Sequence, residues 1–471
     1  MISHSDSYSR SVFTRKYFWL FLGRLLPLFS LFGITVLYSR RLGYAAYGAY
    51  QSVWMYANIV NVVVSFGFSS VLLSANLPYF LRFLRDHRRR LVSFYTVLSI
   101  LTFGAFFLLA KNFSGGLKLL LIAFMVVQNV ITVAETILLK KHGEVVSFVI
   151  NLVYAALFFG CHVFILLTHY SLSTLMTCLI VLSVAKLAAV IMVPVRGAPE
   201  EARAEDEQMV QHWVYMGLTE ILGVVSRWID KIFLLYLLTA ADFAIFFNGS
   251  FEIPFFGLLI SVAGSLMMIE FSRNPGDTSR IISGFRETSD LLSSVVFPLF
   301  FFLYFMRGDL FSIVFNNRYQ ASVPVFAISI FILPLRINNY GAILQCFSKG
   351  NRILTGAVLD IGIALGAMAV FYPLMGSRGI VLSIVLSTYL QSLYYLWHSA
   401  RLLQTGITTL MPFGRLIPKF LVLFALFFSY SRLSAGLPAG TRVLIASILA
   451  AGAMVGGLWR YVRSFLSGSM Q

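Results

Sequence analysis

Four charged side chains lie within one apolar run of the sequence, residues 220–238. Glu220, Arg227, Asp230 and Lys231 fall within a sector of about 100° when the run is drawn as a helix. A charge at the centre of a bilayer costs about 2.5–3.5 kcal/mol on insertion scales, so such a stripe faces protein or water rather than lipid. In a cavity, guanidinium and ammonium groups suit phosphate or carboxylate ligands, and carboxylates suit a proton or a cation.

Polar side chains recur in the same way along several other apolar runs. In residues 47–75 they occupy about 80° of the helical wheel: Gln51, Trp54, Asn58, Asn61, Ser65 and Ser69. The remaining stripes are Tyr17, Arg24, Thr35 and Tyr38 near Pro27, then Gln128, Thr132 and Glu135, then Arg336 and Asn339 after Pro334. A shared aqueous cavity would account for all of these stripes.

A structural explanation competes with the cavity. Arg227 could form an ion pair with Asp230 or Glu220, and buried polar stripes can be hydrogen bonds between helices. Arg24 and Arg336, however, have no acid on their own runs, which favours an anionic ligand. Lys186 has the further alternative of snorkelling towards the end of its span.

The apolar runs must be the elements that position these groups. The chain has 471 residues, of which 59% are hydrophobic and 12% charged, whereas soluble domains carry about 25% charged residues. Most runs reach the length of about 20 residues that crosses a bilayer. We predict an all-α, polytopic membrane protein with fourteen spans: 17–38, 47–75, 91–110, 117–139, 145–168, 172–195, 212–238, 242–270, 288–306, 321–347, 353–373, 379–400, 413–430 and 441–459.

The net charge of +17 is scattered through short loops, so nucleic acid is not an expected partner. Lys and Arg concentrate in alternate loops, most densely at 82–90, which places both termini in the cytoplasm. The three cysteines and seven histidines show no metal-ligand spacing, so we expect neither a metal site nor another bound cofactor, apart from a coupling H⁺ or Na⁺.

The domain organisation follows from an acidic segment and a weak repeat. The segment GAPEEARAEDEQ, residues 197–208, separates six spans from the next six. A shift of 196 residues aligns LGYAAYGAY (42–50) with LTAADFAIF (238–246), and such repeats are common in transporters. We predict an N-terminal lobe at 1–196, a cytoplasmic linker at 197–211, a second lobe at 212–403 and two additional helices at 404–471.

The stretch RRLGYAAYGAYQSVWMYANIVNVVVSFGFSSVLL, residues 40–73, carries a family resemblance. It is similar to the polysaccharide-unit flippases of the multidrug/oligosaccharidyl-lipid/polysaccharide exporter superfamily. That family shows a Leu-Gly-x-x-x-Tyr-Gly turn, matched by Leu42, Gly43, Tyr47 and Gly48, and a small-residue segment, here around Gly67. At Gly43 we expect a backbone φ that other residues resist.

The resemblance implies a V-shaped bundle of two six-helix lobes that opens alternately to each side of a bacterial inner membrane. The implied cargo is an oligosaccharide on a polyprenyl pyrophosphate, moved to the outer leaflet for cell-surface polysaccharide such as lipopolysaccharide or exopolysaccharide. The implied partners are this lipid-linked oligosaccharide, membrane lipids, and polysaccharide polymerase and glycosyltransferase machinery.

On this hypothesis Arg24, Arg227, Lys231 and Arg336 neutralise the pyrophosphate, and Gln51, Trp54, Asn58 and Asn61 contact sugar. Glu220, Asp230 and Glu135 are candidates for binding the coupling ion. One alternative is a multidrug antiporter, whose cationic substrates would prefer an acidic cavity. Another is a polysaccharide polymerase or ligase. We expect no enzyme, because the longest external loop, 307–320, is too short to hold a catalytic site.

The predicted topology can be tested with reporter fusions. A fusion after Arg203 should report a cytoplasmic location, and one near Ile313 an external location. An external signal at Arg203 would contradict both the orientation and the division into lobes.

Overall fold

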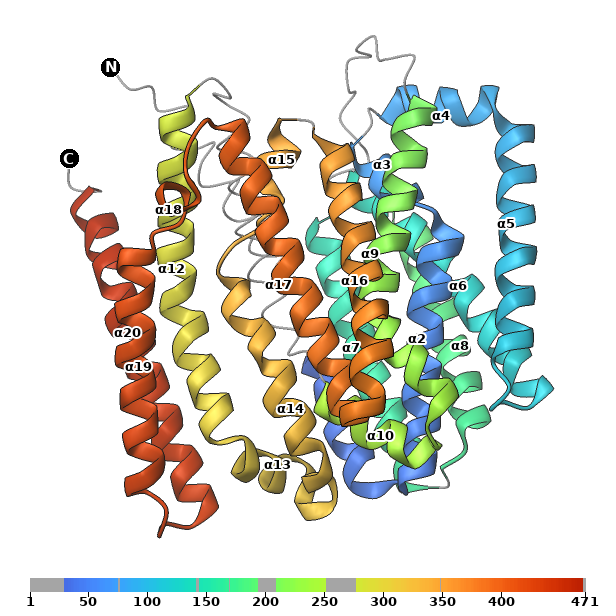
Figure 1. Ribbon diagram of the computed structural model, residues 1–471. Coiled ribbons are helices and arrows are strands. Elements are labelled where there is room, and N and C mark those ends of the chain that lie inside the picture. The colour runs from blue at the N-terminus through green and yellow to red at the C-terminus, as the bar shows by residue number, and fades with distance from the viewer. Residues whose placement is uncertain are drawn as a thin grey trace. The chain divides into compact units, whose positions relative to one another are not determined.

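The computed structural model describes residues 29–74, 77–140, 144–168, 170–193, 209–250, 277–347 and 349–468 (Figure 1). Within these ranges every regular element is a helix. The predicted all-α fold class is confirmed. Many large aliphatic side chains lie on the surface, among them Leu108 at 74% exposure and Leu433 at 87%, as expected of helices that face lipid.

Ten helices in the described part of the chain are long and apolar enough to cross a membrane. They are Arg88–Leu109, Gly115–Leu139, Val145–Leu167, Leu172–Ile191, Thr278–Phe305, Asn317–Ile337, Gly350–Met375, Ser377–Leu402, Phe413–Leu433 and Ala439–Trp459. Each coincides with a predicted span, and the chain is a polytopic membrane protein. Of the other four predicted spans, 17–38 and 242–270 lie largely outside the described residues. The predicted continuous span 47–75 is wrong, because the chain forms two helices there, Tyr44–Ser65 and Phe68–Ser74, separated by Phe66 and Gly67. The span 212–238 falls within one helix, Met209–Leu237, apart from Leu238, but that helix carries four charged side chains. The total of fourteen stays a prediction.

The chain divides into two compact units, Met1–Trp228 and Ile229–Gln471. The division falls inside helix α9 (Met209–Leu237) rather than in the acidic segment 197–208. The predicted lobes, the linker and the additional helical pair therefore stay predictions.

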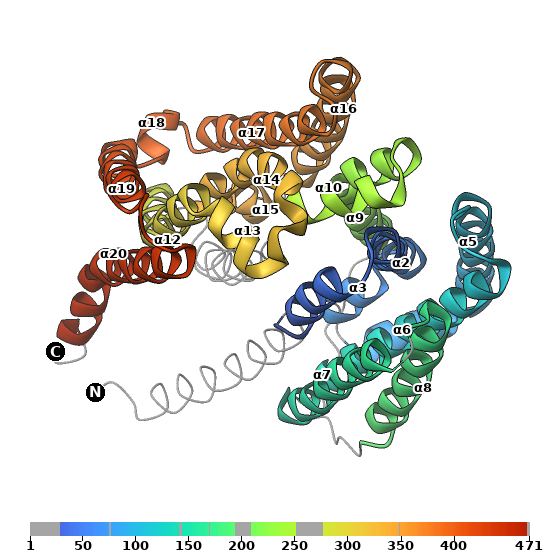
Figure 2. The same ribbon diagram turned by 90° about the horizontal axis from the view of Figure 1, so that it is seen from below.

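The first unit contains a helix at residues 29–41, most of α9, and seven helices between them: α2 (Tyr44–Ser65), α3 (Phe68–Ser74), α4 (Leu77–Asp86), α5 (Arg88–Leu109), α6 (Gly115–Lys140), α7 (Glu144–Leu167) and α8 (Leu172–Ile191). Helix α8 packs against both α6 and α7, and α2 packs against α5 and α6 (Figure 2).

The second unit contains the rest of α9 and the following helices: α10 (Ala240–Gly249), α12 (Thr278–Phe305), α13 (Arg307–Phe315), η1 (Asn316–Ser322), α14 (Val323–Ser329), η2 (Ile330–Ile337), α15 (Ala342–Cys346), α16 (Gly350–Met375), α17 (Ser377–Leu402), α18 (Ile407–Leu410), α19 (Phe413–Leu433) and α20 (Ala439–Gly468). Helices α16 and α17 form an antiparallel hairpin, and α12 packs against η2, α19 and α20.

The junction of α2 and α3 is fixed against α9 by a close backbone contact. Helix α2 ends at Phe66 with φ 42°, and Gly67 follows with φ 71°. A Cβ on Gly67 would lie 2.8 Å from the backbone nitrogen of Gly217 on α9. The indole Nε1 of Trp213 donates to the carbonyl of Phe66 at 3.0 Å. Gly67 thus needs both its left-handed conformation and its missing side chain.

The predicted continuous span at 321–347 is wrong, because the chain breaks after Ile337. Pro334 lies inside η2, and Arg336 leaves helical geometry with ψ 24°. Asn338 is extended, and its side chain donates to the Phe285 carbonyl at 3.0 Å and to Ser289 Oγ at 2.5 Å. A proline removes one backbone donor from the helix, and the buried Asn338 amide then bonds to α12 instead of continuing the helix.

The α19–α20 hairpin is joined to the second unit by ion pairs near both of its ends. Near the start of α19, Lys419 Nζ lies 2.7 Å from Asp290 Oδ1 of α12. Near the start of α20, Arg442 lies 3.1 Å from Asp309 of α13. Beside Lys419, a Cβ on Gly457 would lie 2.8 Å from Ser294 Cβ, so α20 approaches α12 closely.

We expect Gly67→Ser to destabilise the first unit, because a left-handed φ alone costs a side-chain-bearing residue about 1–2 kcal/mol and the clash with Gly217 adds to it. The matched control is Gly43→Ser, at a position with φ −65° and open space around the missing Cβ. The thermal midpoint of the purified protein should fall only for Gly67→Ser. Equal midpoints for the two variants would contradict this packing.

Candidate functional site

The four charges of α9 have separate surroundings. Glu220 accepts a hydrogen bond from Ser70 Oγ of α3. Asp230 and Lys231 are both buried and lie 3.0 Å apart, with Lys231 Nζ also 5.9 Å from the centre of the Phe247 ring. The second carboxylate oxygen of Asp230 is buried and has no hydrogen-bond partner in the described part of the chain.

Arg227 differs from its neighbours because it is exposed. Its Nε donates to the Gly223 carbonyl of the preceding turn at 3.2 Å. Among the described residues no carboxylate forms an ion pair with Arg227, since Glu220 bonds to Ser70 and Asp230 to Lys231. No described residue bonds the two terminal nitrogens of this guanidinium, which can bind a ligand or water.

A polar network also joins α6, α7 and α8. Lys186 Nζ lies 2.9 Å from Glu135 Oε1, donates to Asn151 Oδ1 at 2.9 Å, and sits 4.5 Å from the centre of the Tyr154 ring. The contact with Glu135 has ion-pair distance but not hydrogen-bond alignment. Since the Lys186 side chain is 8% exposed and bound within the helices, it does not snorkel, and that alternative is wrong.

A second part of the network lies along the same three helices. Gln128 donates to Ser183 Oγ at 2.9 Å and to Tyr154 Oη at 3.2 Å. Thr132 was expected on the same stripe, but its hydroxyl bonds to its own helix and its side chain is exposed. Helix α6 therefore presents Gln128 and Glu135 to its neighbours, about two turns apart.

The network contains residues that the sequence analysis did not single out, namely Asn151, Tyr154 and Ser183. A signal for them exists in the sequence. Asn151 and Tyr154 are three residues apart on one span, and Ser183 and Lys186 are three apart on the next. Polar pairs at this spacing lie on one helix face, so two such faces on consecutive spans predict a shared network.

The four residues expected to contact sugar are mostly committed to internal contacts. Gln51 is buried and donates to Tyr47 Oη at 2.6 Å, and Asn61 accepts from Asn129 at 2.8 Å. Trp54 packs edge-on against Tyr50 and Phe124. Of the four, Asn58 is exposed, with its amide bonded to the Trp54 carbonyl at 2.8 Å.

The other expected basic residues are less informative. Arg24 lies outside the described residues. Arg336 is half-buried at the break after η2, and Asn339 accepts from the Gly341 N–H at 3.2 Å.

The turn before α2 has ordinary backbone geometry. Gly43 is the N-cap of α2 with φ −65° and ψ 156°, so the expectation of an unusual φ at this residue is wrong. Leu42 and Tyr47 are buried, and the carbonyl of Gly48 accepts from Ser52 Oγ at 2.8 Å. The left-handed glycine is Gly67, at the far end of the span.

The chain matches the family described as polysaccharide biosynthesis protein over residues 37–324, more than half of its length. It belongs to this polysaccharide biosynthesis family. The matched residues include the α2 turn, the α6–α8 network and all four charges of α9. No curated protein matches the chain by sequence.

Solved structures share the fold of this family member. The lipid II flippase MurJ in an inward closed conformation matches with a TM-score of 0.68 and 12% identity, over 96% of this chain and 100% of the flippase. An inward-facing multidrug resistance MATE transporter of the MOP superfamily matches with a TM-score of 0.56 and 13% identity, over 83% of this chain and 98% of the transporter. A MOP superfamily transporter from Pyrococcus furiosus matches with a TM-score of 0.57 and 12% identity, over 84% of this chain and 95% of the transporter. That transporter is described by the reverse polarity of its binding pocket. The resemblance seen in the sequence is confirmed.

Within the described residues of the family member, no three His, Cys, Asp or Glu side chains gather as metal ligands would. Its three cysteines are free thiols.

We expect Lys186→Met to lower the amount of folded protein, because it leaves Glu135, whose Oε1 is buried although its side chain is 22% exposed, without its counter-charge. Losing one member of a fully buried pair costs about 3–5 kcal/mol in soluble precedents, and this half-buried pair should cost less. The double variant Glu135→Gln/Lys186→Met should recover most of the loss, as measured by membrane abundance and thermal midpoint. Lys111→Met, at an exposed loop lysine, is the matched control. Normal folding of Lys186→Met alone would show that the pair is not structural.

Proposed function

We propose that the protein is a flippase that moves a polyprenyl-pyrophosphate-linked oligosaccharide from the cytoplasmic to the outer leaflet by alternating access. Membership of a polysaccharide biosynthesis family and a fold shared with a lipid II flippase support this class of cargo. The observation that carries the proposal is Arg227, an exposed guanidinium without an acidic partner among the described residues, on a membrane-length helix. A charged side chain within a membrane-length helix is costly, so it marks a candidate functional site.

In the proposed mechanism Arg227 binds the pyrophosphate through its two terminal nitrogens, which match two phosphate oxygens at once. Arg24, Lys231 and Arg336 add positive charge, although Lys231 already has Asp230 as its counter-charge. Asn58, the exposed member of its stripe, is the first candidate for contact with sugar. Its amide offers both a donor and an acceptor to hydroxyl groups.

We assign the coupling ion to Glu135 in preference to Glu220 and Asp230. Protonation of Glu135 would cancel its charge and remove its ion pair with Lys186. Lys186 would keep its hydrogen bond to Asn151. Such a pair has two arrangements that differ by one proton, as a coupling element requires. Glu220 and Asp230 remain alternatives because each also lies on a membrane-length helix.

The second candidate function is a multidrug antiporter, which the match to a MATE transporter keeps open. Cationic drugs would prefer an acidic cavity, and the exposed Arg227 disfavours them. The related transporter with a binding pocket of reverse polarity is a precedent for one fold with pockets of opposite charge. A polymerase or ligase is a weaker alternative, because the matched folds belong to transporters.

The test is complementation of a strain that lacks the gene. The deletion should abolish one surface glycan and leave its lipid-linked repeat facing the cytoplasm. Arg227→Ala should be abundant in the membrane yet fail to restore the glycan, and Arg227→Lys should restore part of it, since an ammonium keeps the charge but loses the two-pronged geometry. The matched control is Arg432→Ala, at an exposed arginine in the last turn of α19.

Three results would contradict the proposal. Full export by a well-expressed Arg227→Ala protein would remove the phosphate role. Joint recovery of abundance and export in Arg227→Ala/Asp230→Asn would make Arg227 a structural partner of Asp230 instead. If the lipid-linked repeat still reached the outer leaflet in the deletion strain, without any homologue present, the cargo would be wrong.

A further inference from the structure

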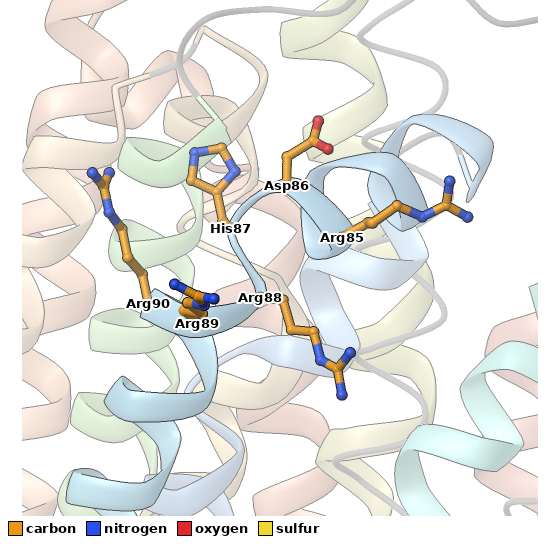
Figure 3. Close-up of a pocket in the computed structure, with 6 residues that line it drawn as sticks. All are labelled: Arg85, Asp86, His87, Arg88, Arg89 and Arg90. Carbon is orange, nitrogen blue, oxygen red and sulfur yellow. The ribbon is translucent and has the colours of Figure 1, made fainter.

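The corner between α4 and α5 has four arginines within six residues. Arg85, Asp86, His87, Arg88, Arg89 and Arg90 line an open hollow of about 540 Å³ (Figure 3). In Figure 3 the guanidinium groups of Arg85 and Arg88 lie on one side of the corner and that of Arg90 on the other. The hollow therefore offers several separate positive groups rather than one convergent cage.

The backbone of this corner is held in place by aromatic packing. Phe80 and Phe83 of α4 are buried in a cluster that includes Trp213 of α9. The His87 ring stacks on Phe83 with centroids 4.5 Å apart, and its Nδ1 lies 3.2 Å from the Phe83 carbonyl. The arginines thus project from a fixed turn and not from a loose loop.

Helix α5 sets the depth of the corner in the membrane. It is a candidate membrane span, and only 6% of its apolar window is buried within the protein. Figure 2 shows it at the edge of the first unit. Exposed side chains run along it, including Val92 at 58% and Ile100 at 66%. Since lipid surrounds most of α5, the arginines of its first turn lie at the level of the lipid head groups.

The four arginines have no counter-charge among the described residues. All are exposed, and within the described residues none forms an ion pair or a side-chain hydrogen bond. Asp86, the one acid lining the hollow, is likewise exposed and outside every such ion pair. Four cations this close repel one another, so an anion bound among them stabilises the folded corner.

We propose that the corner Arg85–Arg90 binds the head groups of anionic phospholipids in the leaflet that meets the first turn of α5. The spread of the guanidinium groups suits the several phosphates that a leaflet presents side by side. Arginine binds such phosphates with two parallel hydrogen bonds. The general preference of Lys and Arg for the cytoplasmic side of a membrane needs only positive charge, so it does not explain a cluster made entirely of arginine. This assignment does not rest on the proposed transport function.

The experiment is native mass spectrometry of the purified protein, titrated with phosphatidylglycerol or with zwitterionic phosphatidylcholine. The wild type should prefer phosphatidylglycerol, and salt should weaken that preference. Arg88→Gln/Arg89→Gln should bind phosphatidylglycerol roughly 30-fold more weakly. Each arginine near an anionic membrane surface contributes about 1 kcal/mol to binding, and the variant loses two of them. Arg88→Lys/Arg89→Lys should keep only part of the affinity, because lysine preserves the charge but cannot form the two parallel hydrogen bonds.

The matched control removes two exposed arginines from other helix ends, Arg378→Gln/Arg432→Gln, and should bind like the wild type. The proposal is overturned if the wild type binds both lipids equally, if Arg88→Gln/Arg89→Gln binds like the wild type, or if the control loses as much. A polyprenyl pyrophosphate that displaces phosphatidylglycerol from the wild type but not from the Gln variant would assign the corner to cargo instead. If the Gln variant does not fold, the salt dependence of the wild type decides.

Discussion

The contact between Gly67 and Gly217 is the constraint on which the arrangement of the first unit depends. Two backbones can approach this closely only where neither residue carries a side chain, and Gly67 must also adopt a left-handed φ. The indole of Trp213 then donates a hydrogen bond to the Phe66 carbonyl at the end of α2, and the Ser70 hydroxyl donates one to Glu220. Because these contacts lie within two turns of α9, they fix the rotation of that helix about its own axis. The direction in which Arg227 points follows from that rotation.

The polar groups of the membrane region fall into two kinds. Most are satisfied by the protein itself, as in the pair of Lys186 with Glu135 and the bond between Gln51 and Tyr47. A few are not, and Arg227 is the clearest among the described residues. Groups of the first kind hold helices in register, and groups of the second kind are free to meet a ligand. A polar stripe on a helical wheel does not separate the two, because both kinds avoid lipid for the same reason.

Sequence periodicity predicted the helices well and their interactions poorly. Hydropathy located the membrane helices because burial in lipid acts on every residue of a span. Hydropathy did not predict the break after Ile337. The extended Asn338 bonds to groups on α12, about fifty residues earlier in the chain, and hydropathy carries no information about such distant partners. The unusual glycine was expected at Gly43 and occurs at Gly67, because only the three-dimensional approach of α9 creates the need for it. Partners such as Asn151 for Lys186 depend in the same way on which helices become neighbours.

The bond between Asp290 and Lys419 has a consequence for how the protein is made. Asp290 is buried and its partner follows 129 residues later in the chain. At the usual speed of translation the carboxylate must wait on the order of ten seconds before Lys419 has even been synthesised. The last hairpin thus completes the second unit, and a ribosome that stops before α19 would leave a nascent chain without the lysine and the arginine that form ion pairs with Asp290 in the folded protein.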